Sequence, residues 1–526
     1  MSVMKKSQTE REKLEEIKNN AEKLLADIQS NYVGSIEYAN LNKMLAICNL
    51  EIGDELTAVH HLIESHAVIL RQHILHRYQK SKLYESLKAK PQIYGLKPTH
   101  VKFETKFADN NESSKSKLAE LPKEWYMIQV TVQYESSSIL KHEKCTSTVM
   151  HAIHITILPT GPSDIEPLCI TLPRPATQVS YDICKEIKKL LNNYRTELKA
   201  TYENRAQYWK MREIQNNKMK IAINGLENIW LREWRILFMA DPIENLEIVD
   251  DMHQMLDKLI LDFKPFPEVL PKHMDYIAFE AMEIIKNHPV TRFPSLHVAY
   301  ALFKEHKDTI IDGCKIIKTT EDMGICMINS SGNLSKMEKR IKLFMDFWLP
   351  QWKLHNTELN EEIFEEALIN HDVLMYTGHG SGVEYLPGEN IEKMKVRSTV
   401  LLFGCSSVKL LTIGGRYPPF GVSNQYLIAC SPCLLGMLWE VTDVDIDKMT
   451  AHFISNWIPS SSERSWTEVD IDSWTSGTLK FTKKTENDKT EMEPEMLRAV
   501  AKSKNTCSHY MTSAAIVVRG LPIKIV

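Results

Sequence analysis

Residues 375–382 read Met-Tyr-Thr-Gly-His-Gly-Ser-Gly, and residues 401–407 read Leu-Leu-Phe-Gly-Cys-Ser-Ser. Each segment is an apolar run of the kind found in buried strands, and each ends in glycine and one reactive side chain, His379 or Cys405. Reactive groups on open α/β sheets gather where parallel strands end at a common edge. The two segments therefore predict an α/β domain in which an imidazole and a thiol meet.

The overall composition indicates a globular protein with protein partners. The chain has 526 residues, of which 43% are hydrophobic and 25% charged, enough for two to four domains with their own cores. A net charge of −4 gives no electrostatic footprint for nucleic acid. The charged opening stretch from Met1 to Glu16, the absence of a long apolar run and the ten scattered cysteines favour an intracellular, reduced protein without a membrane partner.

Metal sites and cofactors find little support in the sequence. Cys430 and Cys433 form the only CxxC, and a zinc site would need a second pair of ligands at suitable spacing. Five histidines crowd one helical stretch without carboxylate or cysteine ligands beside them, which favours a polar, partner-facing surface over a metal site. These are His60, His61, His66, His73 and His76.

The apolar pattern divides the chain into three predicted parts: a helical region (1–100), a mixed strand and helical region (101–288) and an α/β region (289–526). We expect the first to dock a partner, the second to be a substrate-binding or pseudo-protease domain with a helical insert, and the third to be catalytic. Helical spacing runs from Thr9 to Gln79, and Asp109 to Lys117 read as a polar connector. Alternation around residues 128–132 and 153–157 predicts two antiparallel strands joined by the loop from Glu135 to Lys144.

The second half of the chain changes from helical spacing to strands that alternate with helices. A helical insert is expected from Tyr181 to Ile285, with Trp209, Trp230 and Trp234 as its core anchors. Five short strands and one exposed insertion are expected after it. The strands are 324–328, 373–377, 400–403, 427–429 and 514–518, and the insertion is 480–495.

The reactive pair suits thiol hydrolysis of a peptide. Cys405 would be the nucleophile and His379 the proton donor, while the main-chain amides of Gly380 and Cys405 would bind the oxyanion. Ser406 and Ser407 favour a tight turn and a helix start, whose dipole would lower the thiol pKa. The alternatives are a buried core thiol and a phosphate-binding loop, although the glycines follow GxGxG rather than GxGxxG spacing.

Together the motifs resemble separase, the caspase-like (clan CD) cysteine protease of sister-chromatid separation. The resemblance covers about Thr201 to Val526, and six stretches carry it. They are 290–296, 328–334, 376–382, 401–407, 436–447 and 510–526. The resemblance implies a caspase-like catalytic domain with a mostly parallel sheet.

Carried over by position, the resemblance implies that Cys405 is the nucleophile, that His379 is the catalytic histidine and that Gly380 lies at the oxyanion. It also implies cleavage after arginine, with Asp443 and Asp445 as candidates to bind the guanidinium, since a buried guanidinium needs a carboxylate. Asp447 is expected to cap the following helix.

This sequence departs from the family pattern at two motifs. The family's Asn-Pro-Ser-Gly-Asp reads Asn-Ser-Ser-Gly-Asn at residues 329–333, and its Trp-Asp pair reads Trp-Glu at residues 439–440. The first change removes a proline and a negative charge.

The implied biology is cleavage of the kleisin subunit of cohesin at anaphase under control of a securin-type inhibitor, in the cytoplasm with access to chromosomes and spindle, or in the nucleus. The length suits the short insect forms, whose helical scaffold is a separate polypeptide. Two alternatives remain: a non-catalytic scaffold for cohesin regulators, and another caspase-like peptidase of different specificity.

Overall fold

The computed structural model describes most of the chain in two compact units. The first comprises Met1–Gln72, Phe103–Lys188 and Asn224–Met274, and the second comprises His73–Lys102, Lys189–Ile223 and Asp275–Val526. The described residues are all except 1–7, 32–35, 87–94, 104–106, 134–152, 164, 173–182, 199, 240–273, 321–322, 357–358, 413–417, 461, 463 and 483–491. The three-part division at 100 and 288 stays a prediction.

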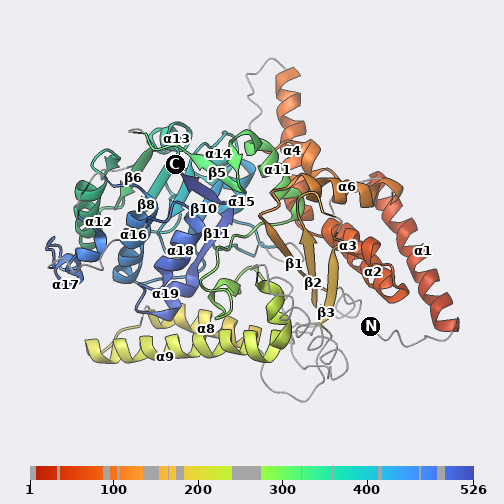
Figure 1. Cartoon of the computed structure of the whole chain (residues 1–526), viewed down its shortest axis with the longest axis horizontal. Helices are drawn as coiled ribbons and strands as arrows, with labels where there is room; N and C mark the ends of the chain where they lie inside the picture. Colours follow the sequence, from red (N-terminus) through yellow and green to blue (C-terminus); the bar gives the residue numbers. More distant parts are fainter. Residues whose placement is uncertain are drawn as a thin grey trace. The chain divides into compact units, whose positions relative to one another are not determined.

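Helices dominate the N-terminal region, as the spacing predicted (Figure 1). They are α1 (Gln8–Asn31), α2 (Ile36–Ile52), α3 (Glu55–Glu64), α4 (Val68–Ser86), α5 (Pro98–Val101) and α6 (Phe107–Glu120). The polar connector predicted at Asp109 to Lys117 is wrong, because these residues lie inside α6. Ser114 and Leu118 of α6 are buried, and Ser114 Oγ lies 3.2 Å from His60 Nδ1, so packing against α3 overrides the polar composition.

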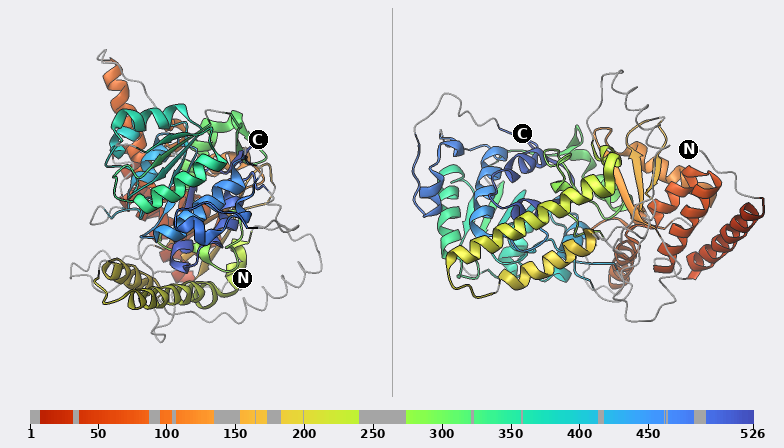
Figure 2. Two further views of the ribbon diagram at one scale, coloured as in Figure 1. Left: turned by 90° about the vertical axis from the view of Figure 1, so that its left-hand side faces the viewer. Right: turned by 90° about the horizontal axis from the view of Figure 1, so that it is seen from below.

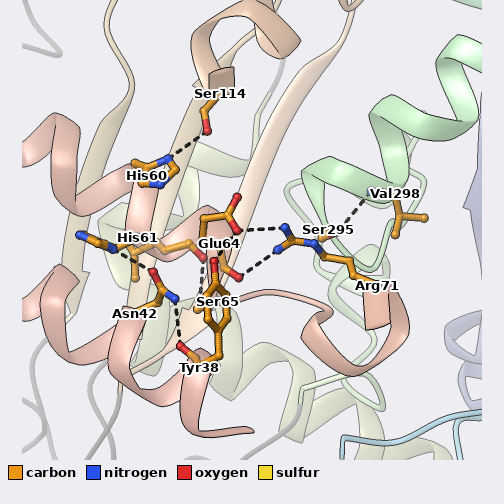
Figure 3. A network of polar contacts seen from close by, with 11 residues as sticks. Tyr38, Asn42, His60, His61, Glu64, Ser65, Arg71, Ser114, Ser295 and Val298 are labelled. Carbon is orange, nitrogen blue, oxygen red and sulfur yellow. Dashed lines mark hydrogen bonds and ion pairs between the residues drawn. The ribbon is translucent and has the colours of Figure 1, made fainter. Parts of the chain in front are cut away.

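Buried polar side chains join the helices of the first unit (Figure 3). Arg71 is fully buried and donates to the Glu64 carboxylate at 2.9 Å, and Tyr38 donates to the same oxygen at 2.9 Å. The Arg71 guanidinium also lies 4.1 Å from the ring centroid of Phe103. Every charge in this network is paired, which is the condition under which a buried ion pair is tolerated.

The predicted polar or partner-facing surface is wrong for His60 and His61, whereas His73 and His76 are exposed and stay candidates for it. His60 and His61 are 3% and 1% exposed, and His61 Nδ1 lies 2.8 Å from Asn42 Oδ1. Burial lowers the pKa of His61 to about 3, so this ring stays neutral. His66 bonds to Thr131, and His73 bonds to Glu392.

The first unit also contains a three-stranded antiparallel sheet of order β1-β2-β3. Its strands are β1 (Tyr126–Val132), β2 (Ile153–Pro159) and β3 (Leu168–Leu172). The predicted pairing of residues 128–132 with 153–157 is confirmed, since Ile128 pairs with Ile157 and Val132 with Ile153. The loop predicted between these strands lies outside the described residues.

The second unit is built on a six-stranded sheet of order β11-β10-β9-β8-β6-β7 (Figure 1). All neighbours pair in parallel except β11, which is antiparallel to β10. The strands are β6 (Gly324–Ile328), β7 (Lys353–His355), β8 (Val373–Thr377), β9 (Thr399–Leu402), β10 (Cys433–Met437) and β11 (Ile516–Gly520). A second sheet of order β12-β5-β4 contains β4 (Ile310–Ile311), β5 (Cys314–Ile317) and β12 (Ile523–Ile525).

The burial of the strands explains which of them could be predicted from the sequence and which prediction was wrong. Every residue of β6, β8, β9 and β10 is buried, so these strands read as continuous apolar runs. The strand predicted at residues 427–429 is wrong, because Leu427 belongs to helix α15 and the strand is β10. A short apolar run does not distinguish a buried helix from a buried strand. The final strand begins at Ile516, two residues later than predicted.

Helices connect and cover these strands, and α12 packs against both β6 and α16 (Figure 1). The longer ones are α11 (Leu296–His306), α12 (Ser335–Trp348), α13 (Glu361–Asn370), α16 (Asp443–Trp457) and α18 (Met496–Lys504). The shorter ones are α14 (Gly388–Ile391), α15 (Val422–Ile428), α17 (Ile471–Thr475) and α19 (Tyr510–Ala515), with single turns at Phe279–Ala281, Lys307–Thr309 and Trp466–Glu468. Most of the insertion predicted at 480–495 lies outside the described residues.

The helical insert contains α8 (Ile183–Leu198) and α9 (Arg205–Gly225), followed by turns at Leu226–Leu231 and Arg232–Phe238. In Figure 2, α9 is the long yellow-green helix beside the blue C-terminal segment. The prediction of tryptophan core anchors is wrong for Trp209, which is 40% exposed and stacks on His509 with ring centroids 5.4 Å apart. Trp234 is half-buried, and the side chain of Trp230 lies outside the description. No helix among the described residues is both long and apolar enough to cross a bilayer.

Candidate active site

The histidine motif (375–382) and the cysteine motif (401–407) lie at the ends of neighbouring parallel strands. β8 and β9 pair with Tyr376 opposite Leu402, and the Phe403 amide donates to the Tyr376 carbonyl at 2.9 Å. His379 follows the end of β8, and Cys405 follows the end of β9. Both reactive residues therefore leave the sheet at the same edge, as predicted.

Glycines bring the two loops into direct main-chain contact. A β-carbon on Gly404 would lie 2.0 Å from the Gly380 carbonyl oxygen and 2.7 Å from that of Gly378, so no other residue fits at position 404 without displacing the histidine loop. Gly404 immediately precedes the thiol, and Gly378 and Gly380 flank the imidazole. This contact sets the spacing between the two reactive residues.

The histidine loop is folded back on the end of its own strand. The Tyr376 hydroxyl donates to the His379 carbonyl at 2.9 Å, and a β-carbon on Gly378 would lie 2.7 Å from that hydroxyl oxygen. Gly380 has φ +60°, a conformation that suits glycine. The His379 side chain is exposed, and its Nε2 lies 2.9 Å from Asn333 Oδ1.

The cysteine loop runs against the segment that follows β10. The Val441 amide donates to Cys405 Sγ at 3.4 Å, and the Ser406 amide donates to the Trp439 carbonyl at 3.0 Å. The Cys405 thiol also lies 3.5 Å from the Val441 carbonyl oxygen. Cys405 is half-buried, so the alternative of a fully buried core thiol does not describe it.

The prediction that a helix starts after Cys405 and lowers its pKa is wrong. Residues 405–408 form a turn, with Ser406 at φ +55°. Burial raises the pKa of the Cys405 thiol; the Val441 backbone opposes the rise, while the Asp443 and Glu440 carboxylates add to it. Without substrate the sulfur is therefore a protonated thiol near neutral pH, and attack on a carbonyl would require a base.

The predicted substrate-binding aspartates belong to the first turn of α16 rather than to an extended segment. Asp445 is 3% exposed and accepts hydrogen bonds from the Ser508 amide at 3.2 Å, the His509 amide at 2.9 Å and the His509 ring. Burial alone would raise the pKa of Asp445, but the His509 contacts and the Ser508 amide outweigh it and hold that pKa below its usual value. Asp443 is exposed and acts electrostatically on Cys405.

Asp447 does not cap the helix, because α16 begins four residues earlier at Asp443. It is 3% exposed and accepts from Arg340 Nε at 2.7 Å, which joins α16 to α12. The structure thus separates three aspartates that the sequence could not distinguish. Asp443 is exposed and acts electrostatically on the thiol, while Asp445 and Asp447 are buried and paired within the protein.

Sequence reasoning missed the contribution of α8 and α9. Arg195 of α8 lies 3.5 Å from Glu440, next to the segment that contacts Cys405. Trp209 of α9 stacks on His509, which in turn holds Asp445, and Asn216 of α9 accepts from the Met511 amide at 3.1 Å. No local motif marks these contacts, since they join residues hundreds of positions apart.

Among the described residues, no three histidine, cysteine or acidic side chains are arranged to hold a metal ion. Cys430 and Cys433 are both buried, with thiol pKa values raised by burial.

Comparison with known proteins shows which proteins this chain resembles. Residues 267–446 match the family model described as the separin protease domain, and this range contains both His379 and Cys405. This part of the chain therefore resembles a separin protease domain. Mouse separin is 31% identical over 195 residues, which are 36% of this chain and 9% of that protein. Separin of Saccharomyces cerevisiae is 28% identical over 253 residues, which are 47% of this chain and 14% of that protein.

The fold extends well beyond the region of sequence identity to separins. The separase chain of the Saccharomyces cerevisiae separase–securin complex matches 93% of this chain with a TM-score of 0.63 at 17% identity. The fold is therefore the caspase-like α/β fold that the sequence predicted. The match covers 36% of that separase chain, and this chain spans only 9% to 14% of the curated separins it matches.

Proposed function

We propose that this chain is a cysteine endopeptidase that cleaves after arginine, with Cys405 as nucleophile and His379 as the group that moves the proton. The observation that carries the proposal is the main-chain contact of Gly404 with Gly378 and Gly380, next to the thiol and on both sides of the imidazole.

The chemistry follows from the state of the two side chains. Because burial keeps the thiol protonated, His379 would take its proton as the sulfur attacks the scissile carbonyl, and would then give a proton to the leaving amine. Water would hydrolyse the resulting thioester. The amides of Gly380 and Cys405 would stabilise the oxyanion, a role worth roughly 10²–10³ in kcat for a single donor in other hydrolases.

Asp443 is the proposed acceptor for the arginine of the substrate. Its carboxylate is exposed and acts electrostatically on the thiol. Asp445, the other candidate, already holds His509 and two backbone amides, so its role would be to fix the first turn of α16 beneath Asp443.

The proposed biological substrate is the kleisin subunit of cohesin, cut to release sister chromatids, with activity in the cytoplasm and on chromosomes and spindle, or in the nucleus. A securin-type inhibitor is the proposed regulator, because the yeast separase that shares the fold was solved with securin. A separate helical scaffold subunit is the third proposed partner. The exposed Ile17 and Leu24 on α1 would suit such a subunit better than the buried histidines.

Covalent labelling tests the enzyme assignment. A peptide ending in an arginine acyloxymethyl ketone should label the wild-type protein at residue 405, and Cys405→Ser and His379→Ala should abolish labelling. Asp443→Asn should weaken labelling by the arginine probe but not by a matched probe with a neutral first residue. Labelling that survives Cys405→Ser would contradict the nucleophile, and no labelling of any variant would favour the non-catalytic scaffold.

The same probes separate the remaining alternative. If wild-type protein reacts at Cys405 with a neutral or acidic probe and ignores the arginine probe, the chain is a caspase-like peptidase of another specificity.

A further inference from the structure

We propose that Asn333 is a positioning residue that sets the tautomer and orientation of the His379 ring. This inference rests on the proposed cysteine-peptidase function. Its structural basis is the contact between His379 Nε2 and Asn333 Oδ1 at 2.9 Å.

The partner atom decides the protonation pattern of the ring. An amide oxygen can only accept a hydrogen bond, so Nε2 must carry the proton that points at Asn333. A neutral ring then has its lone pair on Nδ1. The contact thereby assigns Nδ1 to proton transfer with the thiol and the leaving amine, and Nε2 to orientation.

The loop that contains Asn333 is fixed to the strand that contains His379. β6 pairs with β8 in parallel, with Ile328 opposite Thr377, and the Asn329 amide donates to the Thr377 carbonyl at 2.9 Å. Residue 329 thus leaves β6 at the level at which β8 ends. Asn333 follows four positions later, beside the start of the histidine loop.

Asn329 closes this loop with its own side chain. It adopts φ +48°, a conformation that asparagine tolerates better than most residues. Its Oδ1 accepts from the Leu334 amide at 2.8 Å, its carbonyl accepts from the Gly332 amide at 2.8 Å, and its Nδ2 donates to Glu338 at 2.7 Å. The buried residue Asn329 therefore determines the position of Asn333, independently of the contact between Asn333 and His379.

The amide also differs from a carboxylate in its effect on charge. An aspartate at this position would place a full negative charge beside the ring and favour the imidazolium, whereas asparagine orients the ring without adding charge. The side chains of Asn333 and His379 are both exposed, so their contact depends on the conformation of the loop that contains Asn333. The hydrogen bond would strengthen when a bound peptide excludes water.

Steady-state kinetics on an arginine peptide substrate test the inference. Asn333→Ala should lower kcat about tenfold, the rate equivalent of one net hydrogen bond, with KM little changed. Asn333→Asp keeps the acceptor, so it should retain most of kcat while moving the imidazole-controlled inflection of kcat/KM to higher pH. Ser331→Ala is the matched control on the same loop, where Ser331 bonds to Tyr385 and Glu384 instead, and should behave as wild type.

A second readout does not depend on turnover. Nitrogen-15 chemical shifts of the His379 ring in the Cys405→Ser protein should show the Nε2–H tautomer, and Asn333→Ala should shift the ring toward a mixture. An Nδ1–H ring in the parent, an unchanged kcat in Asn333→Ala, or equal losses in the alanine and aspartate variants would overturn the inference. An inactive wild-type protein that still shows an Asn333-dependent Nε2–H tautomer would contradict the proposed function and support the positioning contact.

Discussion

The α-carbon of Gly404 lies against the main chain of Gly380, so that a β-carbon at 404 would come within 2.0 Å of the Gly380 carbonyl oxygen and 2.8 Å of its nitrogen. Real β-carbons do not approach backbone atoms so closely, and neither segment can yield independently because each continues a buried strand. The distance between the thiol and the imidazole is thereby set by backbone packing rather than by side-chain contacts.

Gly404→Ala should therefore lower kcat strongly while the protein keeps its secondary structure. A displacement of the histidine loop by about 1 Å is expected to cost roughly 10²-fold in kcat, since reacting groups must stay aligned. Peptidase assays combined with circular dichroism would measure both effects. Gly53→Ala is the control, because Gly53 has φ +95° but open space around its α-carbon, and it should affect stability alone.

Neutralising the acidic side chains near the thiol should make it more reactive toward small reagents. The Asp443 and Glu440 carboxylates contribute to the raised pKa of Cys405, so Glu440→Gln and Asp443→Asn should lower that pKa and increase the thiolate fraction at pH 7. Site-resolved iodoacetamide labelling of Cys405 against pH would measure the shift. Asp472→Asn, a matched change at an exposed position of α17, should leave the labelling curve unchanged.

These two variants should differ toward an arginine substrate. Glu440→Gln would keep arginine selectivity, whereas Asp443→Asn would lose it despite a more reactive thiol. If both variants slow alkylation, the assigned electrostatic effect on Cys405 is incorrect.

Asp445→Asn should destabilise the second unit in a pH-dependent manner. We expect a loss of about 1.5–3 kcal/mol in the free energy of unfolding at neutral pH, typical for hydrogen bonds to a charged group. The folded pKa of Asp445 lies below the unfolded value of about 3.9, so its stabilising effect is present above that pH and is lost as the pH falls through the folded pKa.

Urea unfolding between pH 3 and 7 would test this sign. The difference between wild type and Asp445→Asn should shrink below about pH 4, near the unfolded aspartate pKa. A difference that does not shrink between pH 4 and pH 3 would contradict a carboxylate stabilised in the folded protein.

The buried ion pair of the first unit should be sensitive to removal of one partner. Glu64→Gln leaves the fully buried Arg71 guanidinium without its counter-charge, and the expected loss is about 3–5 kcal/mol. The double variant Glu64→Gln/Arg71→Met should recover part of it, because no uncompensated charge remains. Equal stability of the single and double variants, measured by urea unfolding, would contradict this account.

The sequence by itself determined the sheet that carries the site and the pair of reactive residues on it. β6, β8 and β9 are buried on both faces, so their apolar runs predict strands without any knowledge of the neighbouring elements. Glycine next to His379 and Cys405 marked the strand ends, because few other signals produce a sharp turn at a reactive residue. These are properties of short, contiguous segments.

Only the tertiary structure decided how the surrounding charges are used. The opening turn of α16 carries Asp443 and Asp445 two positions apart, and nothing local reveals that His509, far along the chain, binds one and leaves the other exposed. The same holds for Asn333 beside His379 and for Trp209 on His509. Long-range contacts such as these depend on how distant segments pack, and hydrophobic periodicity encodes which faces are buried but not which polar groups meet there.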